Sequence, residues 1–282
     1  MLKDLSPAAL TEGAGHVKPW FFYEPLREIE TYRRVLAAHR IGTANCFGAV
    51  VQPEEKRYWL FLERVPPGLL WQHGAIEVWK AVARWLAGMH AFLVPETERR
   101  DSAHLAHLAH LLNYDRAFYW RWMERAATFV GEGDTSADQR AATAIRGLES
   151  RYEKVVERLA ALPVTVIHGE FHASNVMIDT APEPLRVCPV DWEMAAVGPG
   201  KIDLAGLTSG GWTREQKDAM ALAYYDALPA DRTEKYDRPT FFTDLEYCRF
   251  HQAVQWLGWS PPPEHAQDWL KEALRSADLL GI

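Results

Sequence analysis

The chain has 282 residues, of which 48% are apolar and 24% charged, a composition typical of a globular protein with a sizeable core. Its formal net charge of −7 argues against a nucleic-acid-binding protein, which usually presents a basic face. The apolar runs are shorter than the roughly 18 residues that cross a bilayer, the N-terminus has no apolar signal region, and the three cysteines form no CxxC pair, so we expect a cytoplasmic protein without a membrane span.

The first third of the chain is predicted to mix helix and strand. Residues 27–38 place Ile29, Tyr32, Val35 and Leu36 on one helical face. The segment IGTANCFGAVVQ (41–52) predicts a strand, and RYWLFLERV (57–65) predicts its hairpin partner across the polar turn PEEK. Because the prolines and glycine of VPPGLL interrupt both structures, we predict a small N-terminal lobe (1–65) and a larger C-terminal lobe (66–282).

Beyond residue 66 the pattern is mainly helical. Helices are predicted over residues 76–93, 104–129 and 141–162. The segment PVTVIHGEF (163–171) is typical of a strand, and VMIDT (176–180) with LRVCPVDW (185–192) predicts a second hairpin. From Asp203 to the C-terminus the pattern is helical again, so the expected fold class is α+β.

Polar residues follow the ends of these later strands. Glu170 comes directly after one strand, Asn175 follows five residues later, and the strand RVCPV delivers Asp191 with Glu193 two residues on. A short hairpin brings Asn175 and Asp191 to the same end of the strand pair. Mg²⁺ prefers such oxygen ligands, and phosphoryl transfer requires Mg²⁺ together with a carboxylate that accepts the proton of the acceptor hydroxyl. The pattern therefore indicates a phosphotransferase site.

The stretch VIHGEFHASNVMID, followed by VCPVDWEMAAVGPGKIDLAGL, resembles the aminoglycoside phosphotransferase and choline kinase group, whose fold is that of the protein kinases. That family has His-Gly-Asp, four residues and an Asn, then Asp-aromatic-Glu after a hairpin; this chain has HGEFHASN and DWE. The resemblance implies transfer of the γ-phosphoryl group of ATP to a hydroxyl of a small polar or cationic molecule, such as an aminoglycoside or an amino-alcohol.

The resemblance also implies roles for individual residues. Glu170 would be the catalytic base, and the metal ligands would come from Asn175, Asp191 and Glu193. His168 and Asp203 would support the site, with Asp203 as the N-cap of a helix.

The likeness extends more weakly to a nucleotide site. REIETYRRVL resembles the family helix whose glutamate pairs with a lysine that holds the α- and β-phosphates, and Glu28 is the better match by position. Glu63 to Val65 resembles the hinge that binds the adenine edge. Lys3 and Lys18 are both candidates for the lysine, and Pro19 disfavours a central strand at Lys18. If Lys3 is the partner, the lobe is reduced and its first strands and glycine-rich loop are absent.

Two departures keep other functions open. Glu170 is one methylene longer than the family's Asp, and no glycine-rich phosphate loop is found, so the alternative is a weak or inactive kinase-like protein that binds a nucleotide or metabolite, or acts as a scaffold. His168, Glu170 and His172 also spell H-x-E-x-H, a metallohydrolase pattern that the loop-forming Gly169 disfavours. The pattern does not indicate the acceptor, the choice of ATP or GTP, or the oligomeric state.

Overall fold

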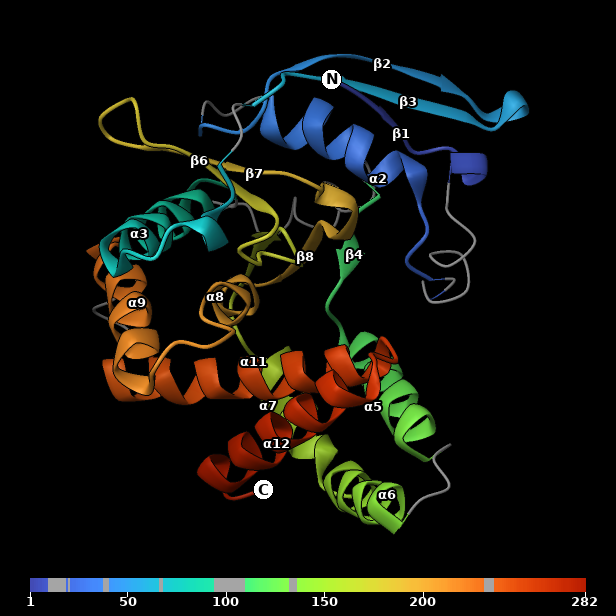
Figure 1. Cartoon of the computed structure of the whole chain (residues 1–282), viewed down its shortest axis with the longest axis vertical. Coiled ribbons are helices and arrows are strands. Elements are labelled where there is room, and N and C mark those ends of the chain that lie inside the picture. Colours follow the sequence, from blue (N-terminus) through green and yellow to red (C-terminus); the bar gives the residue numbers. More distant parts are fainter. Residues whose placement is uncertain are drawn as a thin grey trace. The chain divides into compact units, whose positions relative to one another are not determined.

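The computed structural model describes residues 1–9, 19, 21–37, 41–65, 68–93, 110–131, 136–230 and 236–282 (Figure 1). It divides into two compact units. The first comprises Met1–Leu112 and Thr165–Lys235, and the second Asn113–Val164 and Tyr236–Ile282. Helices predominate and the sheets are small, as the α+β prediction requires. The predicted lobe boundary near Pro66 falls on residues outside this description and stays a prediction.

A small antiparallel sheet begins the first unit. Its strands β1 (Leu2–Asp4), β2 (Cys46–Gln52) and β3 (Arg57–Leu62) lie in the order β1-β3-β2, so the predicted hairpin across the PEEK turn is confirmed. Lys3 lies opposite Leu60, and Leu2 opposite Phe61. Because side chains alternate between the two faces of a strand, Lys3 shares the face of the buried Leu60 while Leu2 and Phe61 are exposed.

Helix α2 (Pro25–Glu30) runs beneath this sheet (Figure 1). Its start is fixed by Pro25 in the first turn and by the Glu24 carboxylate, which accepts the N–H of Leu26. The helix predicted over 27–38 is observed as α2 followed directly by a π-helical segment, η2 (Thr31–Leu36), so the structure adds a change of helix type after Glu30. The predicted apolar face is confirmed as buried. Residue 38 lies outside the described residues.

The second hairpin is formed as predicted by β6 (Val176–Asp179) and β7 (Arg186–Pro189). Another sheet has the order β4-β8-β5, with β4 (Leu112–Asn113), β5 (Val164–Ile167) and β8 (Ala196–Pro199). Helix α3 (Ile76–Leu93) has the predicted bounds, and α8 (Lys201–Leu207) and α9 (Arg214–Asp226) also belong to this unit. Short 3-10 turns are η1 (Pro7–Ala9), η3 (Pro53–Glu55), η4 (Leu70–Gln72) and η6 (Trp192–Met194).

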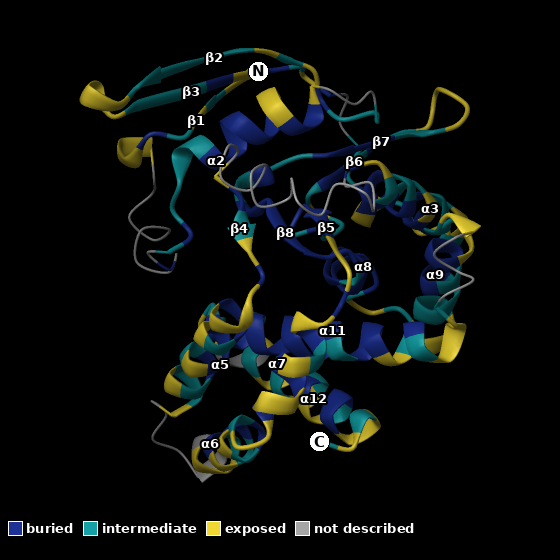
Figure 2. Ribbon diagram, turned by 180° about the vertical axis from the view of Figure 1, so that it is seen from behind, coloured by how far each residue is buried: buried dark blue, intermediate teal, exposed yellow. Residues whose placement is uncertain are grey.

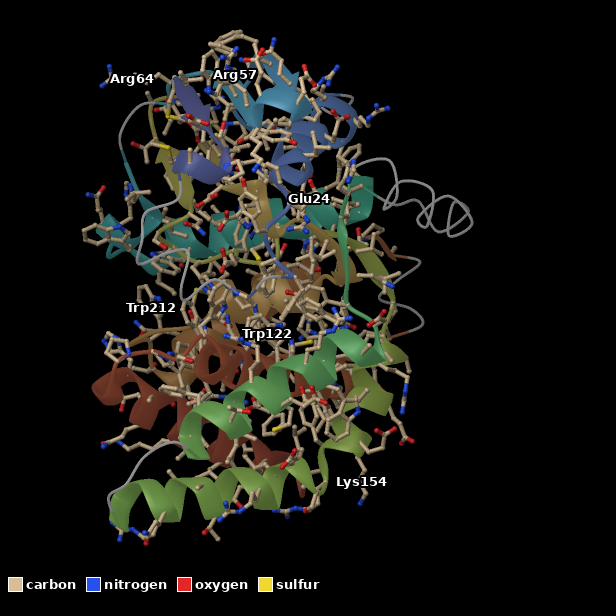
Figure 3. All side chains as sticks on the ribbon, turned by 90° about the vertical axis from the view of Figure 1, so that its right-hand side faces the viewer. Glu24, Arg57, Arg64, Trp122, Lys154 and Trp212 are labelled. Atoms are coloured by element: carbon tan, nitrogen blue, oxygen red, sulfur yellow. The ribbon has the colours of Figure 1, made fainter. Side chains whose placement is uncertain are left out.

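The second unit is helical. It contains α5 (Arg116–Gly131), α6 (Ser136–Glu149), α7 (Tyr152–Ala160), α11 (Arg238–Gly258) and α12 (Pro263–Leu280). Its core includes Trp122 on α5 and much of α11, which is largely buried (Figures 2 and 3). Among the helices of the described ranges, none is long and apolar enough to cross a membrane.

Two helix predictions in this region are wrong in their bounds. Instead of one helix over 104–129, α5 starts at Arg116, because the Asp115 carboxylate accepts the N–H of Phe118 at 2.8 Å and caps it; residues 104–109 lie outside the described residues. Instead of one helix over 141–162, α6 ends at Glu149 and α7 begins at Tyr152. Here the Ser150 hydroxyl donates to the carbonyl of Gly147 at 2.9 Å.

Candidate active site

The loop between β5 and β6 carries Glu170 and Asn175. It folds around the Glu170 carbonyl, which accepts the N–H of His172 at 2.7 Å and the Asn175 side-chain Nδ2 at 3.1 Å. The N–H of Val190 donates to the Asn175 carbonyl at 2.9 Å, which places Asn175 beside the residue before Asp191. The hairpin therefore brings Asn175 and Asp191 to the same end, and the Asn175 amide oxygen is the atom that could ligate a cation.

Asp203 anchors the start of this loop. Its fully buried carboxylate accepts the N–H groups of His168 at 2.7 Å and Gly169 at 2.9 Å, and lies 3.2 Å from Nε2 of His90. The predicted N-cap role is wrong, because the N-cap of α8 is Gly200 and Asp203 is the third helical residue. Its carboxylate therefore binds the backbone of the His168–Gly169 loop rather than capping α8. Gly169 is needed there, since its φ is +84° and a Cβ would collide with the Met194 carbonyl oxygen.

We expect Asp203→Asn to destabilise the protein. An amide presents only one acceptor oxygen, so at least one of the buried N–H groups of His168 and Gly169 loses its partner. The expected cost of about 1–3 kcal/mol corresponds to a fall in Tm of roughly 3–10 °C. Thermal unfolding measures it, with the exposed Asp278→Asn as the isosteric control. Equal Tm values for the two variants would contradict the anchoring role.

His168 joins the loop to the end of β7. Its buried ring has Nε2 at 3.0 Å from the Val190 carbonyl, and the N–H of Glu170 donates to Nδ1 at 3.3 Å. Burial lowers the pKa of His168, so the ring is neutral and Nε2 carries the donating hydrogen. Both ring nitrogens are occupied, and the described part of the chain holds no group of three His, Cys, Asp or Glu suited to a metal. His168 is therefore not free to act as a metal ligand of the H-x-E-x-H pattern, and its ring instead ties the loop to the end of β7.

Lys3, Glu28 and Asp191 meet in one ion-pair cluster. The Lys3 ammonium lies 2.6 Å from Glu28 Oε2 and 2.5 Å from Asp191 Oδ1. Glu28 Oε1 accepts the N–H of Trp192 at 3.3 Å. Of the two lysines that the sequence offered, Lys3 thus pairs with Glu28, and Lys18 lies outside the described residues. Asp191 has φ +68° and ψ +62°, a left-handed conformation that is uncommon for a residue with a side chain.

Charge and burial oppose each other in this cluster. Burial by itself would lower the pKa of Lys3, but the negative charges of Glu28 and Asp191 have the larger combined effect. The net pKa is therefore raised above its ordinary value, and the ammonium stays protonated. Burial raises the pKa of Glu28 to about 6, against the lowering effect of Lys3. A permanent positive charge is therefore held beside Asp191, as an anionic phosphate group would require.

Glu193 lies at the same site, and its partner Arg27 was missed by sequence reasoning. The Glu193 carbonyl accepts a hydrogen bond from Arg27 at 2.7 Å. Glu193 also lines a cavity of about 190 Å³ together with Glu24 (labelled in Figure 3), Lys3, Glu28 and Asp191. The sequence feature that could have pointed to Arg27 is a cation placed beside Glu28 on a helix predicted to pack against the core.

Glu63 and Val65 belong to a separate set of contacts. The Glu63 carboxylate accepts hydrogen bonds from Arg186 Nη1 at 2.7 Å and Nη2 at 2.9 Å, and from the side chain of Asn45 at 2.9 Å. Hydrogen bonds from Arg186 and Asn45 lower the pKa of Glu63 to about 2. Val65 is buried. With its carboxylate engaged, Glu63 could contact a nucleotide only through its backbone.

Residues 22–239 match the family model described as the phosphotransferase enzyme family, well over half of the chain. Among curated proteins there is no significant match.

Solved structures of small-molecule kinases are similar over most of the chain. A microcompartment-associated aminopropanol kinase superimposes with a TM-score of 0.58 at 14% identity, covering 99% of this chain and 84% of that one. Choline kinase from Cryptosporidium parvum superimposes with a TM-score of 0.58 at 13% identity, covering 94% of this chain and 80% of that one. The GDP complex of aminoglycoside 2'-phosphotransferase-IIIa superimposes with a TM-score of 0.55 at 12% identity, covering 90% of this chain and 80% of that one. At such identities the likeness establishes the fold, and the predicted protein-kinase-like fold is confirmed.

Proposed function

We propose, from the premise that this chain belongs to the phosphotransferase enzyme family, that it transfers the γ-phosphoryl group of ATP to a hydroxyl of a small polar or cationic molecule. The observation that carries the proposal is the cluster of Lys3 with Glu28 and Asp191, formed where the β6–β7 hairpin also ends in Asn175. One ammonium and a set of hard oxygen ligands together suit a triphosphate with its magnesium.

The donor set fits Mg²⁺. Asn175 offers an amide oxygen and Asp191 a carboxylate, and two protein ligands completed by phosphate oxygens and water are usual for this ion. Glu193 lines the same cavity as Asp191 and is the candidate for a further ligand. When bound, magnesium would neutralise charge on the transferred phosphoryl group.

The remaining steps fall to side chains of this chain. Lys3, kept protonated by its two carboxylates, would donate to phosphate oxygens of ATP. Glu170 would accept the proton of the acceptor hydroxyl while that oxygen bonds to the γ-phosphorus and ADP leaves. The backbone of Glu63 to Val65 would bind the adenine edge. A cytoplasmic location, where ATP is available, fits this reaction.

A cationic acceptor is favoured by the charge around the cavity. Among the described residues that line it, five carry carboxylates and Lys3 carries the one ammonium, which pairs with two of them; the five are Asp4, Glu24, Glu28, Asp191 and Glu193. Aminopropanol, choline and aminoglycosides, after which the similar solved proteins are named, all combine nitrogen with hydroxyl groups. We therefore propose an amino-alcohol or an aminoglycoside-like molecule as the acceptor.

The second candidate is an inactive kinase-like binding or scaffold protein, and the observation that favours it is Glu170 in place of the family's Asp. Thermal unfolding with and without ATP and Mg²⁺ separates a nucleotide-dependent protein from a scaffold, and ADP release with an acceptor separates an active enzyme from an inactive nucleotide-binding protein. Stabilisation by the nucleotide supports a nucleotide-dependent function. If neither ATP nor GTP raises the Tm, the scaffold is favoured.

Glu170→Gln tests the proposed base. Glutamine has a similar shape but cannot accept the proton, so phosphoryl transfer is expected to fall by about 10²–10⁴-fold. Glu170→Asp keeps a carboxylate and should remain measurably active. The measurement is ADP release with a panel of amino-alcohols. Wild-type rates in Glu170→Gln would exclude Glu170 as the base.

A further inference from the structure

Arg27 is a buried cation to which the proposed reaction gives no role. Only 4% of the residue is exposed, and its guanidinium donates to three backbone carbonyls. The distances are 2.9 Å to Phe22, 2.8 Å to His110 and 2.7 Å to Glu193. Burial lowers the pKa of Arg27 to about 10, with the charges of Glu24 and Glu193 acting against this, so the group is charged at neutral pH.

Arg27 and its neighbour Glu28 hold two successive residues of η6. Glu28 accepts the N–H of Trp192, and Arg27 donates to the carbonyl of Glu193. The segment that follows Asp191 is thus tied to α2 through both a backbone donor and a backbone acceptor. Moving η6 away from α2 would break both bonds.

The third bond of Arg27 reaches another segment that borders the site. His110 leads into β4, and the N–H of Leu112 donates to the carbonyl of Ala195 at 3.0 Å. Arg27 therefore sits where the start of α2, the approach to β4 and the turn after Asp191 converge. A guanidinium suits this place, since its planar set of five N–H groups reaches several carbonyls at once, whereas a lysine ammonium is a compact point charge.

We propose that Arg27 is a positioning residue for Asp191, an inference that rests on the proposed function. It holds η6 against α2, so that Asp191 keeps the left-handed backbone in which it meets Lys3. That conformation is unfavourable for a residue with a Cβ and persists only where the surroundings impose it. Loss of the guanidinium lets Asp191 relax away from Lys3 and from the metal position.

The test compares Arg27→Met and Arg27→Lys with Arg33→Met, a control whose side chain is 52% exposed and pairs with Glu30. Hydrogen exchange of the nucleotide-free protein is the first measurement. We expect amides 192–195 to exchange about tenfold faster in Arg27→Met and less so in Arg27→Lys. Amides of the β6–β7 hairpin should keep their wild-type rates in all three variants. If Arg27→Met fails to fold, Arg27→Lys decides.

The second measurement is the Mg²⁺ dependence of phosphoryl transfer. Misplaced supporting groups weaken metal binding by about 10–100-fold, so the half-saturating Mg²⁺ concentration should rise in the Arg27 variants while the acceptor KM stays unchanged. A merely structural role would lower the rate equally at every Mg²⁺ concentration.

The outcomes separate the two proposals. Wild-type exchange at 192–195 in both Arg27 variants overturns the inference, as does a wild-type Mg²⁺ dependence. If the wild-type chain transfers no phosphoryl group, the proposed function fails, and the exchange rates still decide the inference: faster exchange confined to 192–195 supports the hold of Arg27 on η6, and unchanged exchange refutes it.

Discussion

Asp191→Asn is expected to abolish phosphoryl transfer while the protein stays folded. Asparagine keeps one oxygen but removes the charge that would hold Mg²⁺ and that pairs with Lys3 at 2.5 Å. We expect a loss on the order of 10²–10³-fold or more, as for other groups that stabilise developing charge. The fold tolerates the change for two reasons. Asparagine accepts a positive φ at least as readily as aspartate, and the Asp191 side chain is 42% exposed, so its ion pair adds little stability.

The measurement is ADP release with ATP, Mg²⁺ and a panel of amino-alcohols, together with thermal unfolding. Asp179→Asn is the matched control, because Asp179 lies at the other end of β6, where its carboxylate accepts the N–H of Ala181. Full activity in Asp191→Asn would overturn the mechanism. Equal losses in both variants would point to damage to the hairpin instead.

Lys3→Met is expected to weaken both catalysis and stability. Without the ammonium, the proposed site loses the cation that would neutralise the phosphates from this side, and kcat/KM for ATP should fall by about 10²-fold or more. Glu28, whose side chain is 1% exposed, loses its counter-ion. Breaking a fully buried pair costs about 3–5 kcal/mol, and we expect less here because the Lys3 side chain is 28% exposed.

The loss of stability in Lys3→Met should depend on pH. Burial raises the pKa of Glu28 to about 6, above its ordinary value of 4.5, and removing Lys3 raises it further. A carboxyl group whose folded pKa is raised binds more protons folded than unfolded, so stability falls as the pH rises through that pKa. The difference in Tm between variant and wild type should therefore be larger at about pH 8 than at about pH 5. An equal difference at both pH values would show that Glu28 does not lose its partner.

Lys18→Met is the control for the assignment of the lysine. The sequence left Lys3 and Lys18 both open, and only Lys3 has a described position, between Glu28 and Asp191. Activity should survive in Lys18→Met. If it is lost there and kept in Lys3→Met, the roles of the two lysines are reversed.

Much of the candidate site followed from short stretches of sequence. Alternating apolar residues around a proline-rich turn predicted the β6–β7 hairpin, and a hairpin places the residues just outside its strands at one end. Asn175 and Asp191 were expected together for that reason, and the bond from the Val190 N–H to the Asn175 carbonyl shows that they are. The bounds of α3 were equally local, since its apolar stripe repeats at the helical period.

Contacts between distant segments were decided by the tertiary structure. Lys3 and Asp191 are 188 positions apart, and no periodicity indicates that β1 passes beside the end of β7. Arg27 had no recognisable role because its partners are backbone carbonyls, which every residue offers alike. The resemblance implied that Asp203 caps a helix, yet its carboxylate binds the His168–Gly169 backbone, and the contact of the Glu63 carboxylate with Arg186 had no sign in the sequence. A buried charge takes the donors that packing brings to it, and sequence neighbours do not determine which these are.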